Sequence, residues 1–252
     1  MKPLTEFYGG LHSTQKDYSA GTYDMEALLS SPVWKPWVGL RAGAPFNMLD
    51  VGCGKGLFLR EMVRGLKERW KIIPSRITGV DLVRSPGNLF GEISDTFEFL
   101  QHDTDGNPLP FPDAIFDFLS CNHVLEHVFE TEKLVREFRR VLKPNGFCVI
   151  SVPNLAAWMN RVALLFAGQP LGTEVGTQSI TYGFWPRHFQ THLAQFPPSG
   201  HIRDFTPRAL QDLAEACGFR TAGWWKQSHG MAAALSKWGG RNIAILLQPH
   251  CQ

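Results

Sequence analysis

Three glycines in the segment Asp-Val-Gly-Cys-Gly-Lys-Gly at 50–56 constrain the fold of this chain more than any other feature. Gly52, Gly54 and Gly56 follow a short apolar run and precede a stretch with helical spacing. Glycines at such a point let the backbone turn sharply and approach a ligand without a Cβ in the way. The pattern predicts a ligand-binding loop between a strand and a helix, with a bare turn as the structural alternative. A dinucleotide loop would prefer G-x-G-x-x-G, and the tighter spacing here argues against it.

Beyond this loop, β-rich runs alternate with helical patterns, as in a parallel sheet with crossover helices on both faces. Helices are expected at 56–70 and at 131–142, the second ended by Lys-Pro-Asn-Gly at 143–146. The expected strands lie at 47–51, 76–81, 97–102, 115–121 and 146–152. This half of the chain therefore predicts a doubly wound α/β fold.

The C-terminal part predicts one more helix and two more strands. Thr206 can cap a helix at 207–217, with Pro207 in its first position and Gly218 after its end. The β-like runs at 219–227 and 242–248 would add an antiparallel pair to the sheet edge. With 252 residues, one domain is expected. Its parts are an N-terminal arm and helix at 1–45, a cofactor-binding core at 46–152, an inserted substrate lid at 153–203, and the C-terminal helix and strand pair at 204–252.

Composition and charge favour a small-molecule partner. The formal net charge is +2, and neither sign gathers into a run that would bind nucleic acid. The five cysteines are scattered and form no CxxC pair, as in a protein with reduced thiols. We see no signal peptide and no stretch long enough to span a bilayer, so a cytoplasmic location is expected, with at most peripheral membrane contact.

Polar residues follow the predicted strands at the edge where α/β sheets bind ligands. Asp81 ends the second strand, where a carboxylate can accept hydrogen bonds from a ribose, although it could instead cap a helix. Asp103 follows the third strand and could accept an adenine amine, or be a solvated loop residue. Asn122 and His123 follow the fourth strand and would lie beside the reacting end of a cofactor, unless they cap the next helix.

Five separated motifs together resemble the class I S-adenosylmethionine-dependent methyltransferases, particularly the branch that includes ubiquinone- and menaquinone-biosynthesis methyltransferases. They are Leu-Asp-Val-Gly-Cys-Gly-Lys-Gly at 49–56, Gly-Val-Asp at 79–81, Leu-Pro-Phe-Pro-Asp-Ala-Ile-Phe-Asp at 109–117, Val-Leu-Glu-His at 124–127 and Arg-Val-Leu-Lys-Pro-Asn-Gly at 140–146. The resemblance covers 47–152 firmly, and 203–219 more loosely. Asn145 stands where the family commonly has glycine, although asparagine also tolerates positive φ.

The resemblance implies a mostly parallel, seven-stranded Rossmann-like sheet with an antiparallel last strand. It also implies S-adenosylmethionine as cofactor, S-adenosylhomocysteine as product, and the glycine loop under the methionine part of the cofactor. Asp81 would bind the ribose, Asp103 would lie near the adenine, and Asp50 would help to hold the loop. The expected cofactor-binding residues are Asp50, Gly52, Cys53, Gly54, Gly56, Asp81, Leu82, Asp103, Thr104 and Asn122.

Histidines are the candidates for acid–base work on the methyl acceptor, because imidazole titrates near neutral pH. We single out His127 and His201 as catalytic, with His123 as a further candidate and a packed structural role as the alternative for each. The H-x-x-x-H pairs at 123/127 and 188/192 lack an evident third ligand, so no metal site is expected. Cys53 is interpreted as a packing residue.

Substrate specificity is expected in the insertion at 153–203. Its apolar runs at 155–159 and 162–167 could build a wall or lid, or an amphipathic core helix. Its aromatic residues could stack on a planar or lipid-like acceptor, or only pack the lid: Tyr182, Phe184, Trp185, Phe189 and Phe196. The N-terminal arm could fold over the bound cofactor with its own aromatic residues: Phe7, Tyr8, Tyr18 and Tyr23.

Two alternatives to an active methyltransferase stay open on the sequence alone. One is an NAD-dependent oxidoreductase on a similar sheet, which would prefer a nicotinamide cofactor. The other is a protein that binds S-adenosylmethionine without turnover. The acceptor atom, whether oxygen, nitrogen or carbon, is not indicated by the residues.

Overall fold

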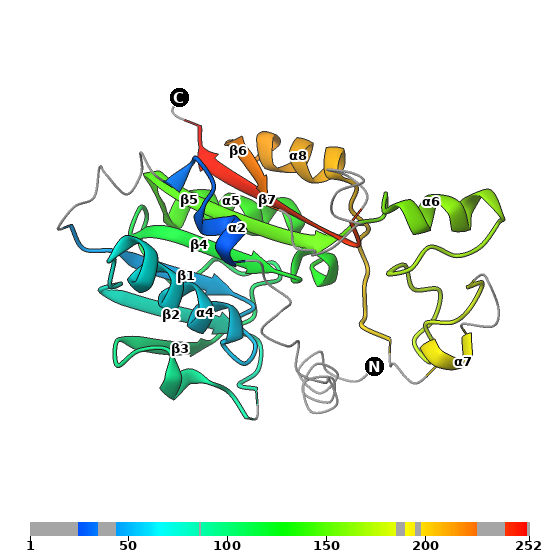
Figure 1. Ribbon diagram of the computed structural model, residues 1–252, viewed down its shortest axis with the longest axis horizontal. Helices are drawn as coiled ribbons and strands as arrows, with labels where there is room; N and C mark the ends of the chain where they lie inside the picture. Colours follow the sequence, from blue (N-terminus) through cyan, green and yellow to red (C-terminus); the bar gives the residue numbers. More distant parts are fainter. Residues whose placement is uncertain are drawn as a thin grey trace.

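The computed structural model describes residues 25–34, 44–85, 87–184, 190–194, 198–225 and 240–250. They form a seven-stranded sheet in the order β3-β2-β1-β4-β5-β7-β6 (Figure 1). The strands are β1 (Asn47–Val51), β2 (Arg76–Asp81), β3 (Phe97–Gln101), β4 (Phe116–Asn122), β5 (Leu142–Pro153), β6 (Phe219–Trp225) and β7 (Asn242–Pro249). Strands β1 to β5 pair in parallel, whereas β7 runs antiparallel between β5 and β6. The predicted fold class, including the antiparallel last strand, is confirmed.

Helices connect the strands, and some of them cover the sheet. They are α2 (Met25–Leu29), α4 (Leu57–Gly65), α5 (Thr131–Val141), α6 (Trp158–Leu165), α7 (Gln190–Leu193) and α8 (Pro207–Ala216), with short helical turns η2 (Leu66–Trp70), η3 (Phe90–Glu92) and η4 (Leu125–His127). Helix α8 begins as predicted, because Thr206 Oγ1 accepts a hydrogen bond from the backbone N–H of Ala209 at 3.2 Å.

The sheet is buried on both faces, which explains its nearly continuous apolar strands. Neighbouring residues of β1 belong to different hydrophobic clusters, because successive side chains of a strand point to opposite faces. Leu49 packs in the cluster that contains Phe138 of α5 and Leu210 of α8, whereas Met48 packs in the cluster that contains Met62 of α4. This double cover leaves the carboxyl ends of the strands as the edge where polar side chains can gather.

Two details differ from the sequence-based expectation. The helix expected at 56–70 continues beyond α4 as the π-helical turn η2, and β5 begins at Leu142 rather than at 146. Leu142 pairs with Phe116 of β4 and the regular register resumes at Phe147, so the intervening residues form an irregularity within the strand. Asn145 therefore lies in a strand and is not among the non-glycine residues with positive φ.

Residues between β5 and α8 leave the sheet. Helix α6 and the short α7 lie to one side of it in Figure 1, joined by long irregular segments. The chain returns beside the sheet where Phe205 forms a β-bridge with Asn154. The segment at 198–203 is thereby brought next to the end of β4.

Candidate active site

The glycine loop follows β1 and is tied to β2. The backbone N–H groups of Gly52 and Cys53 both donate to the carbonyl of Val80, at 2.8 and 3.1 Å. Gly52, Gly54 and Gly56 have φ values of +75°, +53° and +83°, a region that favours glycine. The loop thus has the conformation for which its glycines were singled out.

The three glycines differ in what surrounds them. A Cβ added at Gly52 would lie 2.1 Å from Val124 Cγ2, and one at Gly56 would lie 2.8 Å from Ile93 Cδ1. A Cβ added at Gly54 would meet nothing within 4 Å. The loop is therefore packed against protein at its two ends and open at its centre, as a loop that lies under a ligand must be.

Asp81 joins the end of β2 to this open centre. Its Oδ2 accepts a hydrogen bond of 2.7 Å from the backbone N–H of Gly54. Oδ1 receives a longer contact of 3.4 Å from the backbone N–H of Val83. Asp81 thus fastens the centre of the glycine loop to the end of β2. Asp81 and the next residue, Leu82, are both half-buried at the loop.

Asp50 lies deeper than the other predicted residues. Its side chain is 2% exposed, and its Oδ1 accepts a hydrogen bond of 2.7 Å from Ser120 Oγ of β4. Burial raises the pKa of Asp50 to about 7, against the lowering effect of Ser120 and with a small addition from the charge of Asp81. Asp50 therefore joins β1 to β4 beneath the loop.

Cys53 is buried within the loop. Its Sγ would lie 2.8 Å from a Cβ added at Gly79, so the thiol fills the space that this glycine leaves. Burial, and then the charges of Asp81 and Asp50, raise the pKa of the Cys53 thiol well above its usual range. A neutral thiol is a poor nucleophile, so the interpretation of Cys53 as packing is supported.

Asp103 and Thr104 follow β3 on the rim of the site. Asp103 is exposed, Thr104 is half-buried, and Asp103 Oδ1 accepts a hydrogen bond of 3.0 Å from the backbone N–H of Asp105. Asp105 in turn accepts hydrogen bonds from the backbone N–H groups of Phe129 and Glu130. The loop after β3 is thereby fastened to the start of α5.

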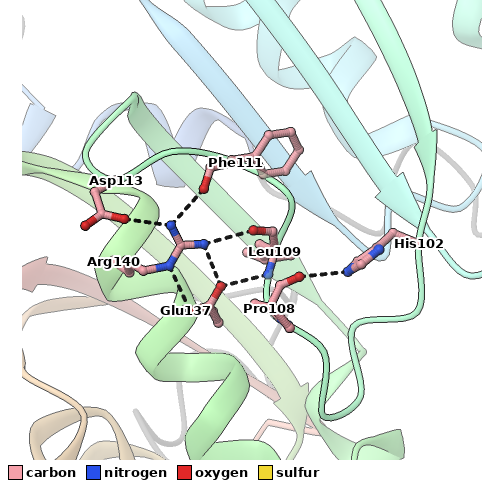
Figure 2. A network of polar contacts seen from close by, with 7 residues as sticks. All are labelled: His102, Pro108, Leu109, Phe111, Asp113, Glu137 and Arg140. Carbon is pink, nitrogen blue, oxygen red and sulfur yellow. Dashed lines mark hydrogen bonds and ion pairs between the residues drawn. The ribbon is translucent and has the colours of Figure 1, made fainter.

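Arg140 of α5 holds the next part of this loop (Figure 2). Its guanidinium donates to the carbonyl oxygens of Leu109 and Phe111 and pairs with Glu137 and Asp113, at 2.7–2.9 Å. The backbone N–H of Leu109 donates to Glu137 as well, and His102 contacts the carbonyl of Pro108. The motif at 109–117 therefore has a structural role, in shaping the loop that flanks the site.

Asn122 and His123 lie where β4 ends. Asn122 is 8% exposed, and its Oδ1 accepts a hydrogen bond of 2.8 Å from Ser151 Oγ of β5. Within the described residues, Asn122 Nδ2 has no hydrogen-bond partner. His123 has a φ of +55° and pairs through Nδ1 with Glu126 Oε1 at 3.1 Å. Neither side chain caps a helix, so the alternative interpretation of these two residues as helix caps is wrong.

His127 and His201 lie together although they are far apart in the sequence. Their ring centroids are 4.9 Å apart. Nδ1 of His127 contacts the carbonyl of Gly200 at 3.2 Å, and Nδ1 of His201 contacts the carbonyl of Gly172 at 2.7 Å. Burial lowers the pKa of His127, and the positive charge of His201 adds to this against the opposing effect of Glu126. His127 is therefore neutral near pH 7.

Glu126 is the site residue that the sequence analysis did not select. It is 1% exposed and lies between two histidines, with its carboxylate beside His123, His127 and His201. Burial alone would raise the pKa of Glu126, but the hydrogen bond and charge of His123 together with His127 bring it below its usual range. The i,i+3 spacing of His123 and Glu126 was the signal available in the sequence.

Most predicted residues thus lie along one edge of the sheet, but two sets of candidates cannot be placed. Trp185, Phe189, Phe196 and His188 lie outside the described residues, as do Phe7, Tyr8, Tyr18 and Tyr23 of the arm. The side chain of His192 is likewise not described.

The fold and this edge define a Rossmann-like protein that binds a nucleotide-type cofactor, and comparison with known proteins identifies the family. A family model described as a methyltransferase domain matches residues 27–222. The chain belongs to this family, and it is an S-adenosylmethionine-dependent methyltransferase of the ubiquinone-type branch. The oxidoreductase alternative is not favoured.

Individual relatives agree on methyl transfer but differ in the acceptor atom. The chain is 31% identical to a ubiquinone/menaquinone biosynthesis C-methyltransferase from Hahella chejuensis, over 86% of each chain. It is 25% identical to a ubiquinone biosynthesis O-methyltransferase from Aeromonas salmonicida, over 75% of this chain and 69% of the relative. A solved S-adenosylmethionine-dependent methyltransferase from Aquifex aeolicus has the same fold, with a TM-score of 0.54 at 14% identity over 95% of this chain and 97% of that one.

No helix among the described residues is both long enough and apolar enough to cross a membrane.

Proposed function

We propose that this methyltransferase transfers a methyl group to a small or lipid-like acceptor held between η4 and the insertion at 153–203. The observation that carries this proposal is the contact between His127 and His201. It joins the end of β4, where ligands of such sheets react, to the segment at 153–203, in which we expect substrate specificity to lie. An acceptor bound there would lie beside both imidazoles.

The cofactor would be held by the residues after β1, β2 and β3. We propose that Asp81 accepts hydrogen bonds from the ribose hydroxyls and that Gly54 lies under the cofactor, because its surroundings are open. Asp103 and Thr104 would contact the adenine from the rim, and Asn122 Nδ2 would donate to the methionine end. When bound, S-adenosylmethionine supplies an activated methyl group on a sulfonium.

The chain itself positions the methyl acceptor and accepts its proton. His127 is neutral at physiological pH, so it can accept a proton from an acceptor hydroxyl as the methyl group is transferred. His201 would orient the same group from the opposite side, since its ring is fixed by Gly172. We propose these two residues as catalytic. His123, which pairs with Glu126, is the further candidate.

The acceptor's apolar character is supported by helix α6. Trp158 is 55% exposed, Leu165 81% and Phe166 59%, which does not fit a core helix. The stretch at 155–173 contains one charged residue, Arg161, and no acidic residue. A surface of this kind suits a lipid-like acceptor and peripheral contact with a lipid surface.

We further propose a cytoplasmic location and no role in nucleic-acid binding. The four described cysteines, Cys53, Cys121, Cys148 and Cys217, are free thiols, as is usual in a reducing compartment. The net charge of +2 provides no polyanion-binding surface by itself.

The test is a transfer assay with S-adenosylmethionine labelled in its methyl group and a whole-cell extract as the acceptor source. After incubation, label is counted separately in the organic-solvent extract, the nucleic acid and the protein precipitate. The proposal expects label in the organic extract, and strongly reduced label with His127→Ala and with His201→Ala. Label confined to nucleic acid or protein would refute the proposed acceptor class.

A further inference from the structure

Glu126, His127 and His201 form a cluster whose geometry goes beyond the needs of proton transfer. Each residue offers one ligand atom, and these three atoms all lie within 4.8 Å of one another. Two residues come from η4 and the third from the insertion. Two imidazoles and one carboxylate are a donor set that divalent first-row transition metals prefer.

The histidine rings are oriented as metal-binding imidazoles usually are. A ligating histidine commonly donates its other ring N–H to a carbonyl or carboxylate, which fixes the tautomer and directs the lone pair at the metal. Nδ1 of His127 faces the carbonyl of Gly200, and Nδ1 of His201 faces the carbonyl of Gly172. Donation from both Nδ1 atoms places the basic lone pairs on the two Nε2 atoms.

The carboxylate of Glu126 supplies an independent observation. Its Oε1 pairs with His123, whereas its Oε2 is fully buried and has no hydrogen-bond partner among the described residues. A buried carboxylate oxygen without a partner costs free energy unless a cation or donor compensates it. Carboxylates that bind a metal are usually hydrogen-bonded as well, as Oε1 of Glu126 is to His123.

The backbone around the cluster is fixed by the insertion. The carboxylate of Glu174 accepts hydrogen bonds from the backbone N–H groups of Ser199 and Gly200, at 2.6 and 2.9 Å. The carbonyl of Glu126 accepts from the backbone N–H groups of Ile202 and Arg203, at 2.8 and 3.1 Å. These bonds hold the segment that carries His201 against η4, so the cluster does not depend on a single loose loop.

The charged groups on the insertion side of the cluster do not oppose a cation. Glu174 and Asp204 add negative charge on the insertion side, and Asp204 interacts electrostatically with His201. The guanidinium of Arg203 is directed at Phe129, because it donates to the Phe129 carbonyl at 3.1 Å and lies over its ring. On the insertion side the field therefore favours a divalent ion, and the charge of His123 beside Glu126 opposes it from the side of β4.

From this geometry we infer that Glu126, His127 and His201 bind a divalent transition-metal ion of the zinc class. Ligands of a tetrahedral zinc ion lie about 2.0–2.2 Å from the metal and about 3.4 Å from one another. Closing the cluster from 4.8 Å therefore needs side-chain shifts of about 1 Å. Three protein ligands leave a coordination position for an oxygen of the methyl acceptor, as in catalytic zinc sites.

This inference differs from the expectation that the chain has no metal site. The expectation considered only pairs of histidines on one helix, whereas the cluster combines one such histidine with its neighbouring glutamate and a distant histidine. The inference goes beyond the proposed function and changes one role in it: with a metal bound, Nε2 of His127 has no lone pair left, so the metal instead of His127 would activate the acceptor oxygen. Metal binding itself is measurable with neither cofactor nor acceptor. The competing explanation is that the two imidazoles share a proton and bind no metal.

The experiment titrates metal-depleted full-length protein with Co²⁺, followed by its visible absorption, and with Zn²⁺ in competition with a chromophoric chelator. Wild type is expected to bind one equivalent of each ion. His201→Ala and Glu126→Gln should each weaken binding at least about tenfold. His250→Ala, which removes an exposed histidine outside the cluster, should bind like wild type.

Two readouts keep the result decisive. S-adenosylhomocysteine affinity, measured on the same variants, reports whether each is folded and separates loss of the metal site from failure of the proposed function. X-ray absorption of the wild-type zinc complex should show two imidazole ligands and needs no variant. Absence of saturable binding by wild type, or equal binding by wild type and the cluster variants, would overturn the inference.

Discussion

The carboxylate of Asp81 accepts a 2.7 Å hydrogen bond from the backbone N–H of Gly54, so the end of β2 and the centre of the glycine loop form one unit. Replacement of Asp81 by Ala should therefore disturb the cofactor site twice, through loss of a ligand carboxylate and of a loop contact. A hydrogen bond to a charged group contributes about 1.5–3 kcal/mol. We expect S-adenosylhomocysteine affinity to fall at least about tenfold in a calorimetric titration, which corresponds to about 1.4 kcal/mol.

The control for this titration is Asp95→Ala, which removes an exposed carboxylate from the turn before β3. It should leave the affinity unchanged. Equal affinities of wild type and Asp81→Ala would show that Asp81 is a structural residue only.

Gly52 and Gly54 should respond differently to the same substitution. Gly52→Ala puts a methyl group 2.1 Å from Val124 Cγ2 in a backbone region that disfavours alanine, so the free energy of unfolding should fall by about 2–4 kcal/mol. Gly54→Ala meets no protein atom within 4 Å and should cost only about 1 kcal/mol. Chemical denaturation measures both changes.

The effect of Gly54→Ala on cofactor affinity should be large although its effect on stability is small. If Gly54 lies under the cofactor, Gly54→Ala weakens binding of S-adenosylhomocysteine out of proportion to its small effect on stability. The double substitution Gly52→Ala with Val124→Ala should recover part of the stability lost by Gly52→Ala alone. Unimpaired cofactor binding by Gly54→Ala would place the cofactor elsewhere.

Asp50 predicts a dependence of stability on pH. Burial raises its pKa from 3.8 to about 7, so between these values the folded protein binds more protons at this site than the unfolded chain does. The contribution of Asp50 to stability therefore falls as pH rises through this window, by up to about 1.4 kcal/mol per pH unit. Below pH 3.8, where both states are protonated, the dependence disappears.

Denaturation of wild type and Asp50→Asn at pH 5 and pH 8 measures this effect. The neutral amide does not titrate, so the variant should gain stability relative to wild type at the higher pH. A difference between the two proteins that is the same at both pH values would contradict the raised pKa.

Arg140 should contribute to stability more than its neighbour Arg139. Arg140 bonds two backbone carbonyls and two carboxylates (Figure 2). Arg139 donates to one carbonyl, that of His250, at 3.3 Å. Arg140→Met should lower the free energy of unfolding by about 1–3 kcal/mol, and Arg139→Met by less than about 0.5 kcal/mol. Similar losses in the two variants would show that the network adds little.

Much of the fold could be predicted because its signals are local. The glycine loop, the cap at Thr206 and the apolar strands each follow from a few consecutive residues. The early start of β5 could not be predicted in this way, because Leu142 extends the strand by pairing with Phe116. Such pairing depends on the neighbouring strand rather than on the propensity of Lys-Pro-Asn-Gly.

For the candidate site, the positions of the selected residues could be predicted to a similar extent, whereas their roles stay predictions. Asp81, Asp103 and Asn122 could be selected because ligands bind after parallel strands. The contact between His127 and His201 could not, since the path of the insertion decides which residues meet η4. Glu126 was missed because nothing in the sequence shows that a glutamate between two histidines is buried.

The most direct test of a cofactor site at this edge of the sheet is a crystal structure with bound S-adenosylhomocysteine. The account predicts ribose hydroxyls within hydrogen-bond distance of Asp81, the ligand over Gly54, and its sulfur on the side of Asn122 and His127. A ligand bound away from Asp81, or with its sulfur remote from His127 and His201, would contradict it.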